Sequence, residues 1–131
     1  MIKLLVDTSV LVPAARRQRH QLPPDLHAAL LDPAALVYVS VVSLWEIAIK
    51  HRLGKLPLPI TLSDLPRVVA RGGFIVLDLT ADHALAQAEP VPATRDPFDR
   101  LLLAVCAVEI TRLLTTDRAL AAHPLAWRAG T

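Results

Sequence analysis

Four short, continuous apolar runs constrain the fold of this 131-residue chain more than any other feature. They are residues 2–6, 36–40, 74–79 and 112–115, and segments with helical periodicity separate them. Runs without polar alternation indicate strands buried on both faces, and strands that alternate with helices favour a parallel sheet. We therefore predict an α/β fold in which helices flank a central parallel sheet of about four to five strands.

Start and stop signals predict helices between these strands. We expect Thr8 or Ser9 to cap the first helix, with Pro13 in its first turn or at a kink. The other helices are expected at 24–31, from 42 to a stop at Gly54, from 61 or 63 to 72, at 81–88, at 97–110 and from 118. Their expected N-caps include Ser43, Thr80 and Asp96.

Length and composition indicate one globular domain over residues 1–131. Apolar residues make up 53% of the chain and charged residues 20%, which argues against disorder. The longest apolar run, 101–108, is far shorter than the ~20 residues that span a bilayer. No secretory signal is visible, and the single cysteine, Cys106, excludes an internal disulfide. We expect a cytoplasmic protein without a membrane partner.

Four acidic residues from distant parts of the chain are expected at one edge of this sheet. Asp7 follows the first strand and Asp117 the last, while Glu46 and Asp99 lie in the first turns of helices. Open parallel sheets bind ligands outside the carboxyl ends of their strands. Taken singly, each acid has a structural explanation as a cap, a turn residue or an i,i+4 partner of Lys50. In combination they indicate a shared site, and the helix dipole favours an ionised Asp99.

Carboxylates gathered in this way repel one another unless a cation neutralises them. A site made only of oxygen ligands favours a hard ion, Mg²⁺ or Mn²⁺. Such an ion activates water and stabilises charge on a phosphodiester, so the residues predict a metal-dependent nuclease. The chain contains no GxxxxGK[ST], GxGxxG or GxSxG motif, and its histidines show no zinc spacing.

Four segments in order, LLVDTSVL, SVVSLWEIAIKHRLGKL, RDPFDRLLLA and LLTTDRAL, resemble PIN-domain proteins, specifically VapC-type toxins of type II toxin–antitoxin pairs. The resemblance covers about residues 2–122. It implies a three-layer α/β/α PIN domain and a Mg²⁺- or Mn²⁺-dependent endoribonuclease. The implied catalytic and metal-binding residues are Asp7, Glu46, Asp99 and Asp117. Residues implied to orient carboxylates or water are Thr8, Asp96, Thr115 and Thr116.

The resemblance also implies partners. Its members cleave structured RNA such as tRNA or rRNA, form homodimers or larger toxin–antitoxin assemblies, and are silenced by a small antitoxin of VapB or similar type. The antitoxin tail enters the active-site groove. Relatives with DPFDR often carry a histidine shortly before it, whereas this chain has Thr94 near that place. This departure leaves open the shape of the groove and its substrate preference.

Basic clusters in the chain suit a polyanionic partner. Our candidates for contacts with RNA phosphates are Arg16, Arg17, Arg19, Lys50, Arg95 and Arg100. Lys50 has a rival role in an ion pair with Glu46. Two other hypotheses stay open at this point. One is a non-catalytic module that binds RNA or protein, and the other is a PIN-type nuclease that acts on DNA.

Overall fold

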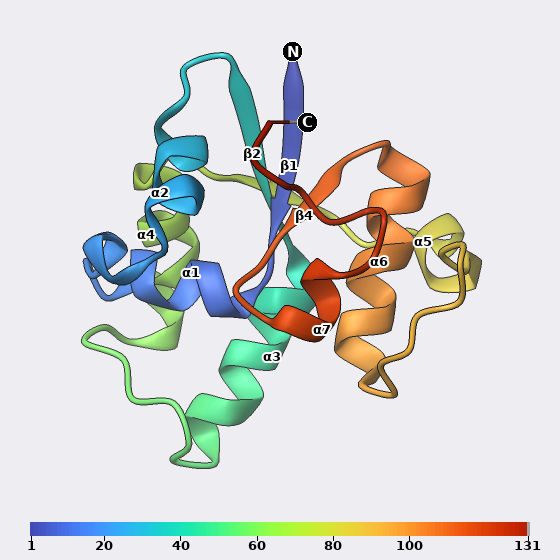
Figure 1. The fold of residues 1–131 in the computed structure, drawn as a ribbon. Coiled ribbons are helices and arrows are strands. Elements are labelled where there is room, and N and C mark those ends of the chain that lie inside the picture. The colour runs from blue at the N-terminus through green and yellow to red at the C-terminus, as the bar shows by residue number, and fades with distance from the viewer. Residues whose placement is uncertain (131) are drawn as a thin grey trace.

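The computed structural model describes residues 1–130, which form a four-stranded sheet with all strands parallel. The strands are β1 (Ile2–Val6), β2 (Ala35–Ser40), β3 (Ile75–Leu77) and β4 (Arg112–Leu114), in the order β3-β2-β1-β4. In the register, Leu4 lies opposite Val37 of β2, and Leu5 lies opposite Leu113 of β4. Because the strands share one direction, their carboxyl ends meet at the lower edge of the sheet in Figure 1.

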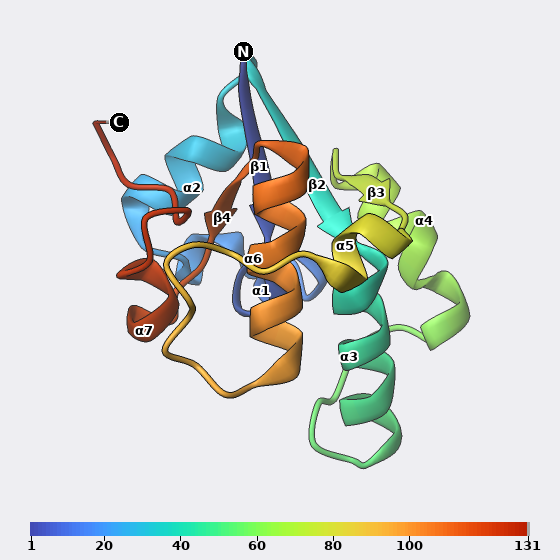
Figure 2. The same ribbon diagram turned by 90° about the vertical axis from the view of Figure 1, so that its right-hand side faces the viewer.

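Helices cover both faces of this sheet. Within residues 1–130 they are α1 (Thr8–Ala15), α2 (Pro24–Leu31), α3 (Val41–Arg52), α4 (Leu65–Arg71), α5 (Ala81–Leu85), α6 (Pro97–Glu109) and α7 (Arg118–Ala121). Short 3₁₀ turns occupy Arg19–Gln21 and Leu62–Asp64. Helices α1, α2 and α4 lie on one face, and α5 and α6 lie on the other (Figures 1 and 2). The predicted three-layer α/β/α fold is confirmed.

Two hydrophobic clusters explain why the strands contain unbroken apolar runs. Leu4 and Val6 of β1 belong to the cluster that faces α1, α2 and α4. Leu5, between them, belongs to the cluster that includes Leu102 and Leu103 of α6. All five side chains are at most 1% exposed. Successive residues of a strand point to opposite faces, so a strand with helices on both sides must be apolar throughout.

The caps of the first helices differ from the prediction. The N-cap of α1 is Asp7, not Thr8 or Ser9, because the chain is extended at Asp7 and helical from the next residue. Pro13 lies inside α1, which ends two residues later at Ala15. Pro13 has no N–H to donate to the carbonyl four residues earlier, and the chain leaves the helix at Arg17, which has a left-handed φ of 58°.

Helix α3 is capped by Ser40, whose hydroxyl accepts a hydrogen bond from the Val42 N–H at 3.1 Å. The prediction of Ser43 was wrong, and that residue is buried in the first turn. The predicted caps Thr80 of α5 and Asp96 of α6 are confirmed.

Several elements are shorter than predicted. Strand β3 covers only Ile75–Leu77 and is an edge strand that pairs with β2 alone. The prediction that every strand is buried on both faces is wrong for β3, in which Ile75 and Val76 are exposed. Helix α5 ends at Leu85, and the helix expected from residue 61 or 63 begins as a 3₁₀ turn before α4.

The C-terminal segment packs back onto the sheet. The N–H of Trp127 donates to the carbonyl of Leu113 at 2.8 Å, and the partly buried indole packs against the first cluster. None of the helices formed by residues 1–130 is both long and apolar enough to cross a lipid bilayer.

Candidate functional site

Asp7 is the most buried acid at the carboxyl edge of the sheet, with 4% of its surface exposed. Its carboxylate accepts hydrogen bonds from Ser9 Oγ at 2.5 Å and from the Thr115 hydroxyl. Burial raises its pKa, and these hydroxyl contacts oppose that rise. Pairing of β1 with β4 brings Thr115 to Asp7 across 108 residues of chain, so the orientation of this carboxylate is a product of the sheet.

Glu46 lies in the second turn of α3 and is 5% exposed. Lys50 donates from Nζ to Glu46 Oε2 at 2.7 Å, so the i,i+4 pair expected from the sequence is present. The pKa of Lys50 is raised, first by this hydrogen bond and then by the charges of Glu46, Asp96 and Asp99. Lys50 is therefore a cation that interacts electrostatically with several of the predicted site acids.

The first turn of α6 gives its two aspartates different surroundings. Asp96 is the N-cap, and its Oδ1 accepts from the N–H groups of Phe98 at 2.8 Å and Asp99 at 3.4 Å. Asp99 is half-buried, and no group among residues 1–130 donates a hydrogen bond to its carboxylate. Asp96 thus caps the helix, while the oxygens of Asp99 keep their lone pairs.

The pKa of Asp99 is raised to about 6. Partial burial is the largest cause, followed by the negative charges of Asp96, Asp7, Glu46 and Asp117. The helix dipole still favours an ionised Asp99, but its effect is smaller than the effects that raise the pKa. A helix N-terminus contributes only a modest favourable term near the surface, and burial with four like charges outweighs it.

Asp117 is exposed and caps α7, where its Oδ1 accepts from the N–H groups of Ala119 at 2.8 Å and Leu120 at 3.3 Å. Two hydroxyls connect its loop to β1. The Thr115 hydroxyl accepts from the Asp117 N–H at 3.0 Å while it donates to Asp7.

Ser9 is the second connecting hydroxyl, and sequence reasoning missed it as a site residue. Its Oγ donates to Asp7 and accepts from the Thr116 N–H at 3.0 Å. The available signal was a hydroxyl two residues after an acid at a strand-to-helix turn, a spacing at which side chains bond locally. Thr8 lies beside it in the wall of a cavity of about 330 Å³ that Lys50 also lines.

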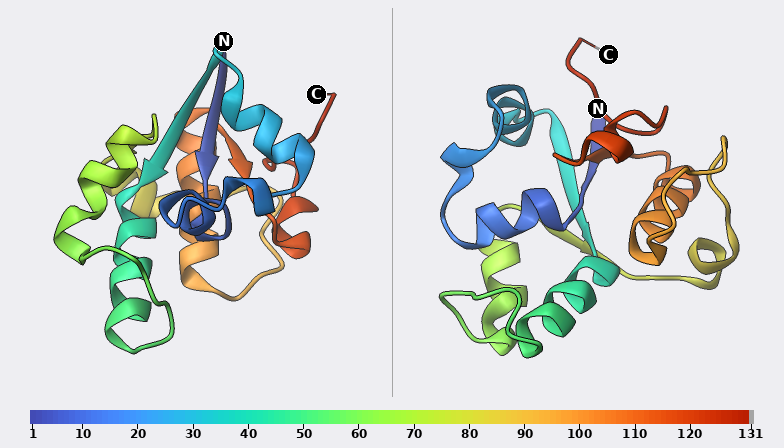
Figure 3. Two further views of the ribbon diagram at one scale, coloured as in Figure 1. Left: turned by 90° about the vertical axis from the view of Figure 1, so that its left-hand side faces the viewer. Right: turned by 60° about the horizontal axis from the view of Figure 1, so that its bottom comes forward.

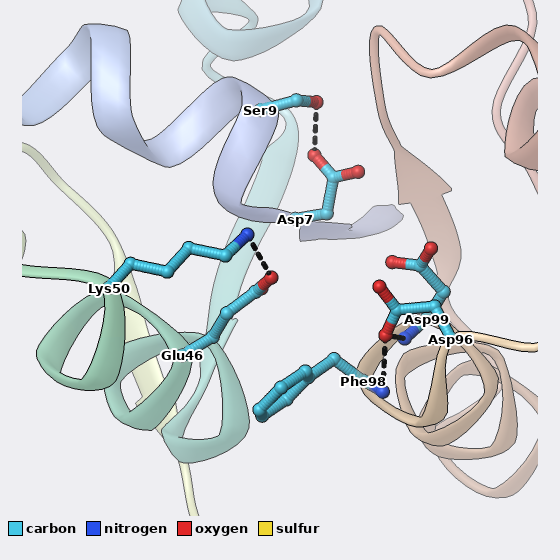
Figure 4. A network of polar contacts seen from close by, with 7 residues as sticks. All are labelled: Asp7, Ser9, Glu46, Lys50, Asp96, Phe98 and Asp99. Atoms are coloured by element: carbon cyan, nitrogen blue, oxygen red, sulfur yellow. Dashed lines mark hydrogen bonds and ion pairs between the residues drawn. The ribbon is translucent and has the colours of Figure 1, made fainter. Parts of the chain in front are cut away.

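Asp7, Glu46 and Asp99 border one region between β1, α3 and α6, in which the Asp7 carboxylate turns toward Ser9 and the Glu46 carboxylate toward Lys50 (Figure 4). The right panel of Figure 3 shows the elements that surround this end of the sheet. Among residues 1–130, no three His, Cys, Asp or Glu side chains form a group ready to hold a metal ion. The acids lie around this region but do not form a preassembled set of metal ligands. Their chemistry fits a hard cation, because the donors are oxygens and Asp99 has both repelling neighbours and free lone pairs.

The six basic residues predicted to contact RNA fall into two places. Arg16, Arg17 and Arg19 lie beyond the C-terminal end of α1, at the opposite end from Asp7, and line a cavity of about 760 Å³. Two of them support loops there: Arg16 Nη2 donates to the Pro57 carbonyl at 2.7 Å, and Arg19 Nη2 to the Gly72 carbonyl at 2.9 Å.

Lys50, Arg95 and Arg100 belong to the segments that carry Glu46 and Asp99. Arg100 Nε donates to the Thr94 carbonyl at 2.6 Å, and the Thr94 hydroxyl accepts from the Asp96 N–H at 3.2 Å. Thr94 therefore shapes the loop that leads into α6.

Comparison with protein families matches residues 4–124 to the PIN domain. No curated protein is a match for the chain. PIN domains are generally nucleases, which supports a hydrolase. The match covers most of the chain and agrees with the parallel sheet and the acids at its carboxyl edge, so this chain belongs to the PIN domain family.

Proposed function

We propose that this chain is a metal-dependent endoribonuclease, the VapC-type toxin of a type II toxin–antitoxin pair. The observation that carries the proposal is that Asp7, Glu46 and Asp99, from three separate elements, border one region, where the charges of Asp7 and Glu46 act on Asp99 (Figure 4). Partial burial, followed by repulsion from the neighbouring carboxylates, raises the pKa of Asp99, and this excess of negative charge favours binding of a divalent cation. The negative charge of Asp117 also contributes to the raised pKa of Asp99.

The contacts of each residue indicate its role in the proposed reaction. A bound Mg²⁺ or Mn²⁺ would supply an activated water and charge stabilisation at the phosphodiester. Asp7, held by Ser9 and Thr115, and Asp99, with free lone pairs, are the residues best placed to hold the ion. One carboxylate oxygen of Glu46 accepts a hydrogen bond from Lys50, and the other would be available to a water molecule or to the ion. Lys50 is half exposed and would contact a phosphate oxygen of the RNA.

The proposal is tested by RNA cleavage with added Mg²⁺ or Mn²⁺. We expect Asp7→Asn and Asp99→Asn to abolish cleavage while the fold, followed by circular dichroism, is unchanged. Asp82→Asn is the matched control, because this exposed carboxylate on α5 is not among the charges that act on Asp99. Full activity in either site variant would contradict the assignment. A metal titration without binding would favour the non-catalytic module, and cleavage of DNA alone would favour the DNA-directed nuclease.

The biological part of the proposal has its own tests. We expect induced expression to arrest growth through cleavage of tRNA or rRNA in the cytoplasm, and sequencing of RNA ends after brief induction would identify the cut. Coexpression with a small antitoxin encoded next to the gene should restore growth and yield a stable complex. Sedimentation would establish whether the toxin is a homodimer.

A further inference from the structure

An aromatic pair joins the two helices that carry Glu46 and Asp99. Trp45 immediately precedes Glu46 on α3, and Phe98 immediately precedes Asp99 on α6. The ring centroids lie 5.6 Å apart with the planes at 65°, an edge-on arrangement. The Phe98 ring extends from α6 toward α3 in Figure 4. The aromatic contact is therefore built on the same helical turns as two of the site acids.

Core packing does not explain Trp45. The residue is 61% exposed and is a member of neither hydrophobic cluster, whereas Phe98 packs against the second one. Tryptophan is highly buried in most proteins because its ring carries a large apolar area. Here the indole is supported by Phe98 and otherwise presents much of its surface to water, one residue away from a buried carboxylate.

We propose that Trp45 is a stacking platform for an unstacked RNA base next to the phosphodiester at the acids, with Phe98 holding the indole in place. Single-stranded RNA is recognised by aromatic rings that stack on bases, combined with positive groups that contact the backbone. Both kinds of group occur here, since Lys50 lies on the same helix as Trp45 with its side chain 48% exposed. The choice of RNA as ligand rests on the proposed function.

Stacking on Trp45 positions the strand without reading its sequence. Every base has a face that stacks, so the platform would tolerate any base and favour nucleotides that a loop or a strand end leaves unstacked.

Binding is measured first, without cleavage. A short 2′-O-methyl oligoribonucleotide is titrated in EDTA while tryptophan fluorescence is followed. The chain has two tryptophans, and Trp127→Phe removes the partly buried one outside the site. We expect the oligonucleotide to quench Trp127→Phe, and a fully abasic strand of the same length to leave the fluorescence unchanged. Absence of quenching would overturn the proposal.

Kinetics then separate stacking from a structural role. We expect Trp45→Ala to raise KM for RNA about tenfold or more with kcat nearly unchanged, and Trp45→Phe to restore most of the affinity. Leu53→Ala is the matched control, since this side chain follows the same helix and is 63% exposed. An unchanged KM in Trp45→Ala would overturn the stacking role.

Two further outcomes are distinguishable. If Trp45→Ala dissociates a dimer in sedimentation while RNA affinity stays the same, the indole is an interface between copies and the proposal is wrong. If the chain cleaves no RNA but Trp127→Phe is still quenched by the oligonucleotide and not by the abasic strand, the nuclease function fails and the stacking site stands.

Discussion

Asp99 is the residue at which opposing electrostatic effects meet. Its position in the first turn of α6 lowers the energy of the charged form, whereas partial burial and neighbouring carboxylates raise it. The second group of effects is larger, and the pKa rises to about 6. Without a cation, burial and repulsion destabilise the charged form of Asp99, and a bound metal ion would offset this destabilisation.

Replacing Asp99 with Asn should therefore stabilise the metal-free protein at neutral pH. The folded pKa lies above the unfolded value, so the contribution of Asp99 to stability is complete below about pH 4 and is lost as pH rises through about 6. Because the side chain is half exposed and solvent screens the repulsion, we expect Asp99→Asn to gain about 1 kcal/mol at pH 7.

Urea unfolding in EDTA between pH 4 and pH 8 checks this. The difference between the two proteins should vanish near pH 4, and Asp82→Asn should show no such crossover. A variant less stable than the wild type at pH 7 would mean that Asp99 has a stabilising partner in solution.

At the scale of elements, the start of α6 carries a helix-capping acid, Asp96, and a candidate metal ligand, Asp99. Asp96→Ala removes hydrogen bonds to the N–H groups of Phe98 and Asp99, and we expect it to cost about 1 kcal/mol. Asp96→Asn keeps a capping oxygen and should unfold like the wild type in urea while it retains RNA cleavage. Loss of metal binding in Asp96→Asn, as complete as in Asp99→Asn, would make Asp96 a ligand.

The residue that ends α6 has an unfavourable backbone conformation. Ile110 is the C-cap, with φ 56° in the left-handed region, and its side chain is 86% exposed. This conformation costs a β-branched residue about 1–2 kcal/mol, and glycine adopts it freely at a smaller entropic cost. We expect Ile110→Gly to raise stability by about 0.5–1 kcal/mol in thermal unfolding.

Leu85→Gly is the control of opposite sign. Leu85 is equally exposed at 86%, but it ends the regular turns of α5, where glycine is unfavourable. Destabilisation by Ile110→Gly would show that the isoleucine makes contacts that outweigh its backbone strain.

At the scale of the whole molecule, a metal at the acids would connect parts that are distant in the chain. Asp7 follows β1, Glu46 lies on α3, Asp99 on α6, and Asp117 caps α7. Binding to the folded state alone at a hundred times Kd adds about 2.7 kcal/mol, which raises Tm by roughly 10 °C for a domain of this size.

Differential scanning fluorimetry with Mn²⁺ or Mg²⁺ measures this shift. We expect it to disappear in Asp7→Asn and to persist in Asp82→Asn. An equal shift in wild type and Asp7→Asn would place the ion elsewhere on the molecule.

Sequence patterns predicted the parallel sheet because buried strands must be apolar throughout, and they predicted Asp96 and Thr80 as caps because capping is local. They misplaced the caps of α1 and α3, where Asp7 and Ser40 compete with nearby hydroxyl residues for one position. Local chemistry allows several neighbours to cap a helix, and the backbone path selects one.

The sequence by itself therefore determined the alternation of strands and helices and the Glu46–Lys50 pair, since these depend on neighbours in the chain. Tertiary structure alone decided the contacts of Thr115 with Asp7 and Ser9, the pKa of Asp99 and the contact of Trp45 with Phe98. These depend on distances between segments far apart in sequence. Such distances follow from strand order and helix packing, which no local pattern encodes.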